Sequence, residues 1–72
     1  MNLKTTIYNR ILEPKYLKVY QYIEELPRTS RMSLMKANKQ DIINVLADIV
    51  SIKEKYGIPY SEDLLLIEKY KK

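Results

Sequence analysis

Apolar residues recur every three or four positions along most of this chain, which is the period of an amphipathic α-helix. After Pro14, the apolar positions are Tyr16, Leu17, Val19, Tyr20, Ile23 and Leu26. Between residues 39 and 56 they cover more than one face, and they are Ile42, Ile43, Val45, Leu46, Ile49, Val50 and Ile52. A last segment, residues 61–72, contains Leu64, Leu65, Leu66, Ile67 and Tyr70. The pattern predicts an all-α fold in which the helix of residues 39–56 is central and most buried.

Prolines and capping residues mark the expected ends of the first helices. Pro14 suits the first turn of a helix over residues 14–26, where a missing N–H costs nothing. Pro27 is expected to end that helix, because the residue before a proline is pushed out of the α region. Thr29 or Ser30 can then cap a short helix over residues 31–37.

Similar signals predict the later boundaries. Asn38 can cap the helix of residues 39–56, and Gly57, the only glycine, stands where a left-handed C-terminal cap is needed. Ser61 can cap the last helix, with Glu62 and Asp63 in the first turn, where the helix dipole favours acids. We therefore expect one small domain over residues 1–72, built as a compact bundle of four to five helices.

Residues 3–12 fit two patterns. Leu3, Ile7 and Ile11 repeat at four-residue intervals, as on a helix, while the same stretch also alternates between apolar and polar positions, as on a strand. We expect a helix, because no later segment offers a partner strand.

Positive charge is concentrated in the first half of the chain. Residues 1–40 contain eight Lys or Arg and three Glu, whereas residues 41–72 contain five Lys and six acids. Within the first half, the fifteen residues Leu26–Gln40 contain no acid and carry Arg28, Arg31, Lys36 and Lys39. This segment is a candidate contact surface for a phosphate backbone or an acidic partner.

The composition argues against an enzyme. The chain has no cysteine and no histidine, and its single glycine excludes a glycine-rich phosphate loop. We expect no catalytic residue, no metal, no cofactor and no small-molecule substrate. The first ten residues lack the apolar core of a signal peptide, and no apolar run approaches the length of a membrane span. The expected location is the cytoplasm, without membrane insertion.

The segment YIEELPRTSRMSLMKA, residues 22–37, resembles the opening of helix-turn-helix, winged-helix-like regulators of phages and bacteria, and the resemblance extends over about residues 20–50. It implies a helix-turn-helix-like fold. It also implies that base edges are contacted by Lys39, Gln40 and Asn44, with Asp48 further along. The phosphate contacts would come from Arg28, Arg31 and Lys36.

Two other families offer weaker resemblances. KTTIYNRIL, residues 4–12, resembles the DNA-contacting strand of ribbon-helix-helix proteins, which would require an obligate dimer. DIINVLADIVSIKEKYGIPYSEDLLLIEKYKK, residues 41–72, resembles the closing helices of bacteriocin immunity proteins, which are basic antiparallel four-helix bundles.

Seven tyrosines in so small a domain suggest that some lie at an interface. Tyr16 and Tyr20 share a face of the first helix, so Tyr22 is the one expected outside. The run Leu64–Ile67 presents apolar groups nearly all round its helix, which makes Leu66 a candidate interface residue and a homodimer a hypothesis. We expect a non-catalytic regulator of phage or plasmid origin that binds DNA or a DNA-binding protein. The alternatives are a protein-only inhibitor or antirepressor and an immunity-type bundle.

Overall fold

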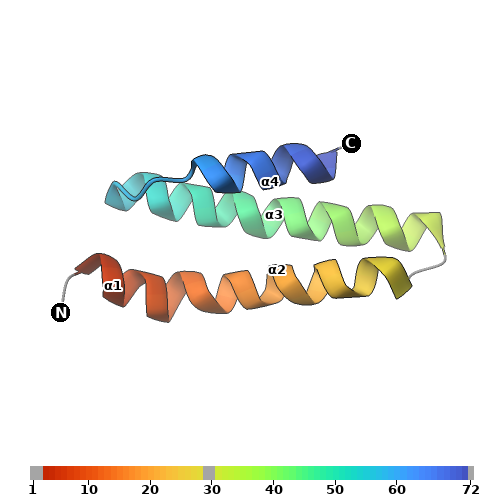
Figure 1. Ribbon diagram of the computed structural model, residues 1–72, viewed down its shortest axis with the longest axis horizontal. Helices are drawn as coiled ribbons and strands as arrows, with labels where there is room; N and C mark the ends of the chain where they lie inside the picture. Colours follow the sequence, from red (N-terminus) through yellow and green to blue (C-terminus); the bar gives the residue numbers. More distant parts are fainter. Residues whose placement is uncertain (1–2, 29–30, 72) are drawn as a thin grey trace.

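The computed structural model describes residues 3–28 and 31–71, and helices account for almost all of them (Figure 1). The elements in order are α1 (Leu3–Ile7), a π-helical turn η1 (Tyr8–Leu12), α2 (Glu13–Glu25), a 3-10 turn η2 (Leu26–Arg28), α3 (Met32–Tyr56) and α4 (Ser61–Lys71). No strand occurs within these two ranges, so the all-α prediction is confirmed. The helical state of residues 3–12 also agrees with the sequence, and it removes the strand that a ribbon-helix-helix protein would need.

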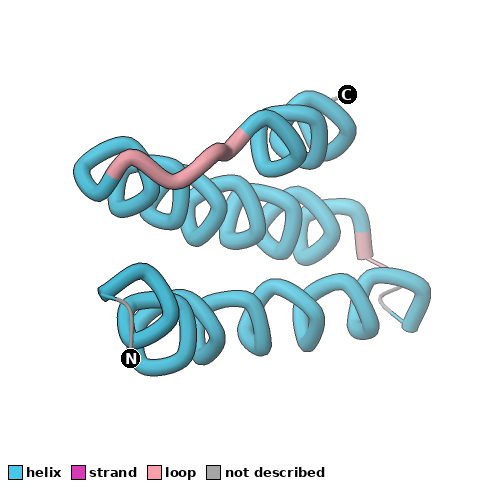
Figure 2. Tube along the Cα trace, turned by 60° about the vertical axis from the view of Figure 1, so that its left-hand side comes forward, coloured by secondary structure: helices cyan, strands magenta, loops and turns pink. Residues whose placement is uncertain are grey.

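The elements form three antiparallel helical rods side by side (Figures 1 and 2). The first rod contains α1, η1, α2 and η2 in succession; α3 runs back along it, and α4 lies along the other side of α3. The principal extents are 44 × 19 × 13 Å, so the molecule is elongated; α3 packs against both other rods, and a hydrogen bond from Tyr16 to Asp63 joins the first rod to α4 directly. The described residues thus form three rods, fewer than the four to five helices expected of a compact bundle.

The predicted break at Asn38 is wrong. The expected helices over residues 31–37 and 39–56 are one continuous helix, α3, of 25 residues. An asparagine inside a helix costs less than about 1 kcal/mol relative to alanine, and the apolar stripe continues across it from Met35 to Ile42. The bend that a helix-turn-helix pair would require at this position is therefore absent. Arg31, in extended conformation, precedes the helix, and the capping residues proposed at 29 and 30 lie outside the described residues.

The π-turn η1 explains why the first apolar stripe differs from the expected one. In this turn the N–H of Glu13 donates to the carbonyl of Tyr8, five residues earlier. Residues five apart then share a face, so Ile7 is followed on the core face by Leu12, and Ile11 is 39% exposed. Pro14 gives a local reason for this geometry: it has no N–H to donate to Arg10, and its ring would clash with that carbonyl in a regular α-helix.

The chain passes Pro27 without leaving the helical region. Leu26 keeps φ −52° and ψ −49°, and the 3-10 turn η2 carries the chain through Pro27 to Arg28. The predicted helix end is therefore close to the observed one, but the predicted reason, a displaced Leu26, is wrong.

Gly57 ends α3 as expected. Its φ of 69° and ψ of 28° are left-handed, its N–H donates to the carbonyl of Glu54, and the N–H of Ile58 donates to that of Lys53. These two bonds form a Schellman motif, which satisfies carbonyls that the helix end leaves free. The following α4 begins at Ser61, and the N–H of Leu64 donates to the carbonyl of Tyr60. The helical hydrogen bonds therefore begin one residue earlier than a Ser61 cap would imply.

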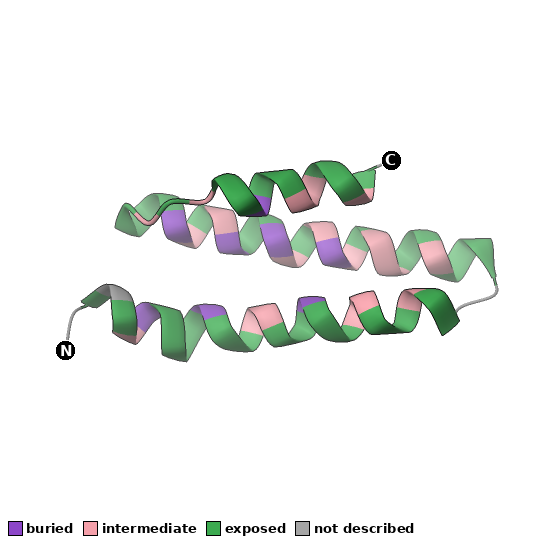
Figure 3. Ribbon diagram, in the orientation of Figure 1, coloured by how far each residue is buried: buried purple, intermediate pink, exposed green. Residues whose placement is uncertain are grey.

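The core lies where the first rod, α3 and α4 face one another (Figure 3). The buried hydrophobic residues are Ile7, Leu12, Val19, Ile42, Leu46 and Ile49. Tyr22 packs against this cluster, whereas Tyr20 is 56% exposed, so the expected exposure of Tyr22 is wrong. At about 100° per residue, Tyr22 lies about 60° from the buried Val19 and Tyr20 lies about 100° from it. Leu66 also packs against the core, while its neighbour Leu65 is 71% exposed.

Within the described ranges, no helix combines the length and apolar character that crossing a bilayer requires.

Candidate functional site

Three of the predicted contact residues meet in one surface depression. Lys36, Lys39 and Gln40 lie on one flank of α3, and the last turn of α4 lies beside them. The depression, called the basic groove below, has a volume of about 410 Å³ and is lined by Lys36, Lys39, Gln40, Ile43, Tyr70 and Lys71. No acidic side chain is among these lining residues. The groove thus combines three ammonium groups with an aromatic ring and an aliphatic side chain.

The groove continues toward the start of α3. A second, smaller depression shares Lys36 and Lys39 with it and adds Met32 and Met35. Met32, Lys36, Lys39 and Ile43 follow one another at spacings of four, three and four residues, so they form one stripe along the helix. This stripe spans about 16 Å along the helix axis.

The other predicted contact residues lie around the groove and not inside it. Arg28 and Arg31 are exposed on either side of the connection between η2 and α3. Among the described residues, no ion pair engages Arg28, Arg31, Lys36 or Lys39. Asn44 accepts a hydrogen bond of 2.9 Å from Gln40, so these two amides already pair with each other.

Asp48 faces the opposite flank of α3 from the basic groove. Its carboxylate pairs with Lys15 of α2 at 3.3 Å, and both residues line a separate depression together with Arg10 and Lys18. That depression contains an acid, so its positive potential is partly neutralised. The α3 flank with the predicted base-contacting residues therefore does not include Asp48.

Tyr70 and Lys71 belong to the groove but were missed by the sequence analysis. The sequence assigned no binding role to the lysine-rich end of the last helix. Because α4 is antiparallel to α3 and shorter, its last turn lies beside Lys36 and Lys39. The exposed Lys71 also pairs weakly with Glu68, at 3.8 Å. Lys69 places its ammonium 5.5 Å from the centre of the Tyr70 ring.

A second exposed surface lies on the first rod. Tyr8, Glu13, Tyr16, Leu17 and Tyr20 line a depression there, and Leu17 and Tyr20 are each more than half exposed. The ring centres of Tyr8 and Tyr16 are 6.2 Å apart, and those of Tyr16 and Tyr20 are 6.3 Å apart. We call the exposed side chains Tyr8, Leu17 and Tyr20 the aromatic strip.

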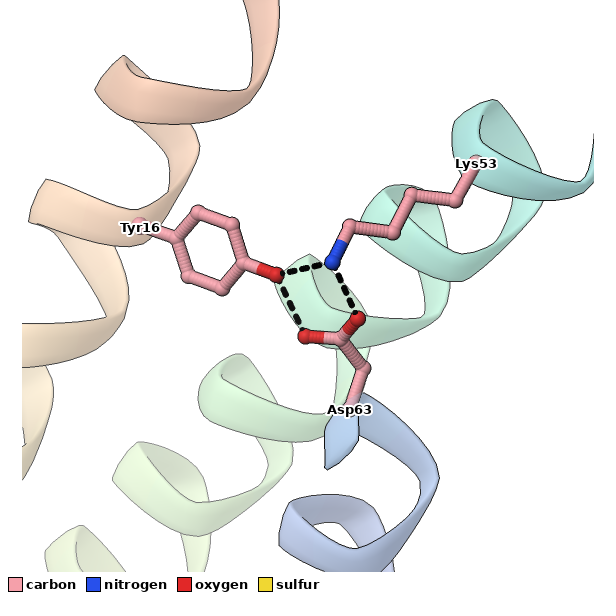
Figure 4. Close-up of polar contacts among 3 residues, drawn as sticks. All are labelled: Tyr16, Lys53 and Asp63. Atoms are coloured by element: carbon pink, nitrogen blue, oxygen red, sulfur yellow. Dashed lines mark hydrogen bonds and ion pairs between the residues drawn. The ribbon is translucent and has the colours of Figure 1, made fainter. Parts of the chain in front are cut away.

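A buried polar cluster joins the three rods (Figure 4). The Lys53 ammonium of α3 donates to Asp63 Oδ2 of α4 and to the Tyr16 hydroxyl of α2, at 2.7 Å each. The Tyr16 hydroxyl donates to Asp63 Oδ1 at 2.5 Å, which closes a ring of three contacts. Lys53 is 8% exposed and Asp63 is 2% exposed. No buried polar side-chain atom among the described residues lacks a partner.

The electrostatics of this cluster favour a structural role. Burial and the hydrogen bond to Asp63 raise the pKa of Tyr16 to about 12, so its hydroxyl stays protonated. Burial disfavours the charge on Lys53, but the hydrogen bonds to Asp63 and Tyr16 outweigh that effect and raise the pKa of Lys53. A protonated phenol and a charged ammonium, both engaged, provide neither a base nor a nucleophile. The cluster therefore positions α4 against α2 and α3.

The sequence contained a signal for this cluster. Ile42, Leu46, Ile49 and Lys53 are spaced by four, three and four residues, which places a lysine on the most buried stripe of α3. A charge on such a stripe needs a buried partner, and an acid in the first turn of the helix that follows is one candidate.

Fold and surface together define a small, basic, all-helical protein with an open groove at the junction of α3 and α4. The chain matches no protein-family model, and neither a curated protein nor a solved structure matches it.

Proposed function

We propose that this protein is a non-catalytic regulator that binds the phosphate backbone of a nucleic acid through the basic groove. The observation that supports this function best is the grouping of Lys36, Lys39 and Lys71 around one depression without an acidic lining residue. Lysine ammonium groups bind phosphates as point charges, and they release condensed counterions when they do so. Arg28 and Arg31, which lie on either side of the connection between η2 and α3, would add further phosphate contacts.

The contact would differ from that of a helix-turn-helix protein. Because α3 is continuous, the ligand would lie along its flank, between the stripe from Met32 to Ile43 and the last turn of α4. Gln40 and Asn44 are near enough to contribute hydrogen bonds, provided that they exchange their mutual bond for one to the ligand.

The test is a fluorescence-anisotropy titration with random-sequence DNA of about 20 nucleotides, single-stranded and duplex, in about 50 and 200 mM salt. Lys36→Gln/Lys39→Gln is compared with Lys18→Gln/Lys55→Gln, which removes the same charge from exposed sites outside the groove. We expect the groove variant to lose affinity and to flatten the salt dependence, by about 0.7 to 0.9 in logarithmic slope per lysine.

Equal losses in the two double variants would show diffuse attraction to a basic surface and would contradict a specific groove. Absence of binding to both DNA forms at the lower salt concentration would overturn the proposed function.

A second candidate function is inhibition of another protein through the aromatic strip. The aromatic strip groups three exposed side chains, Tyr8, Leu17 and Tyr20, around one depression. Exposed aromatic residues of this kind are enriched in protein interfaces. A partner captured by the wild type and lost in Tyr20→Ala, with no effect of Lys36→Gln/Lys39→Gln, would favour this function.

A further inference from the structure

We infer that the basic groove takes single-stranded nucleic acid in preference to a duplex, with a base stacked on Tyr70. This inference rests on the proposed function and specifies the form of its ligand. It follows from the apolar and aromatic lining residues of the groove, to which contacts with phosphates alone assign no role.

The groove has an aromatic and aliphatic part as well as a charged one. Tyr70 and Ile43 line it, and Met32 and Met35 line its continuation along α3. A duplex keeps its bases stacked inside and presents a charged backbone ridge to a shallow surface of this kind. A single strand can turn unpaired bases toward these apolar and aromatic side chains while its phosphates reach Lys36, Lys39 and Lys71.

Tyr70 is placed where a base could reach it. It is partly buried, so its side chain is held by the core, and it also forms part of the groove lining. A tyrosine ring that is fixed in a positively charged groove is a typical stacking platform for single strands.

The Lys69 ammonium, 5.5 Å from the centre of the Tyr70 ring, does not prevent stacking. An exposed cation–π contact is weaker than the stacking of a base on an aromatic ring. A base can therefore displace Lys69 from the ring. The displaced ammonium is then available to a neighbouring phosphate.

The experiment compares oligothymidine of about 20 nucleotides, a random duplex of the same length, and inorganic polyphosphate, each as a ligand of the full chain. Three proteins are used: the wild type, Tyr70→Phe, which keeps the ring, and Tyr70→Leu, which keeps an apolar side chain. Circular dichroism confirms that each variant has the helical content of the wild type.

We expect the wild type to bind the single strand at least about tenfold more tightly than the duplex. Tyr70→Leu should lose about tenfold in single-strand affinity with an unchanged salt slope, and Tyr70→Phe should retain it. Neither variant should change the affinity for polyphosphate.

Three outcomes would overturn the inference. Equal or tighter duplex binding would assign the groove to duplex phosphates and would leave the proposed function standing. Equal single-strand affinity in folded Tyr70→Leu and the wild type would remove the stacking role. Failure to bind either DNA form would overturn the proposed function together with the inference.

Discussion

At the scale of single residues, the most consequential side chains are polar and buried. Tyr16, Lys53 and Asp63 form a closed set of hydrogen bonds in which each group engages the other two. Such a cluster is stabilising only while all members keep their partners, because a buried charge without one is costly.

The Tyr16 hydroxyl predicts a loss of stability at alkaline pH. Its pKa is about 12 in the folded chain against an ordinary value of 10.0. A folded pKa that is raised means that the stabilisation is complete below pH 10 and is lost as the pH rises through about 12. The raised pKa of Lys53 acts in the same direction. Urea denaturation at pH 8, 10, 11 and 12 should show this loss.

Tyr16→Phe is the control for that measurement. It should be less stable than the wild type at pH 8 and should lose less stability between pH 10 and 12. An identical pH dependence in the two proteins would assign the alkaline loss to the other tyrosines and lysines.

At the scale of elements, α4 is attached to the first rod and α3 through Asp63 and through the apolar residues Leu66, Ile67 and Tyr70. Asp63→Asn would leave the Lys53 ammonium buried without a carboxylate, since the Lys53 side chain is only 10% exposed. We expect a loss of about 3–5 kcal/mol in the free energy of unfolding. Chemical denaturation followed by circular dichroism measures it.

Glu62→Gln is the matched control, because Glu62 is the exposed acid beside Asp63 in the first turn of α4. It should lose at most about 1 kcal/mol, the value of a helix-dipole interaction. Similar losses in both variants would mean that Asp63 acts only through the dipole.

The sequence predicted elements better than their junctions. The helical fold and the Gly57 cap followed from periodicity and from a residue suited to left-handed backbone. The continuity of α3 did not, because the capping preference of Asn38 competes with a stripe whose stabilisation comes from packing. The π-turn was not predicted either, since Ile11 and Leu12 are equally apolar and Pro14 was interpreted only as a helix start.

The candidate site was predicted in part, for a related reason. The acid-free segment indicated Lys36, Lys39 and Gln40, which lie on one flank of one helix. Tyr70 and Lys71 are thirty or more residues away in sequence and join them only because α4 folds back along α3. Gly57 predicted the end of α3, but the local pattern did not indicate which flank of α3 the last helix would cover.

At the scale of the whole molecule, α3 is packed unevenly along its length. All buried hydrophobic residues on α3 lie between Ile42 and Ile49, where both other rods pack against it, whereas Met32 near its start is 74% exposed. Hydrogen exchange measured by mass spectrometry should therefore be slowest in peptides covering residues 42–53 and much faster in those covering residues 32–36. Uniform protection along α3 would contradict this gradient.

The position of the basic groove along that gradient has a consequence for affinity. The start of α3, which carries Lys36 and Lys39, is the part of the helix with the least tertiary support. Binding of the proposed ligand there would be coupled to helix formation, so the measured affinity would be the intrinsic one multiplied by the fraction of molecules in which this end is helical. Substitutions at exposed positions of the helix would therefore change the affinity. A better helix former at an exposed position such as Ser33 would tighten binding without touching the ligand.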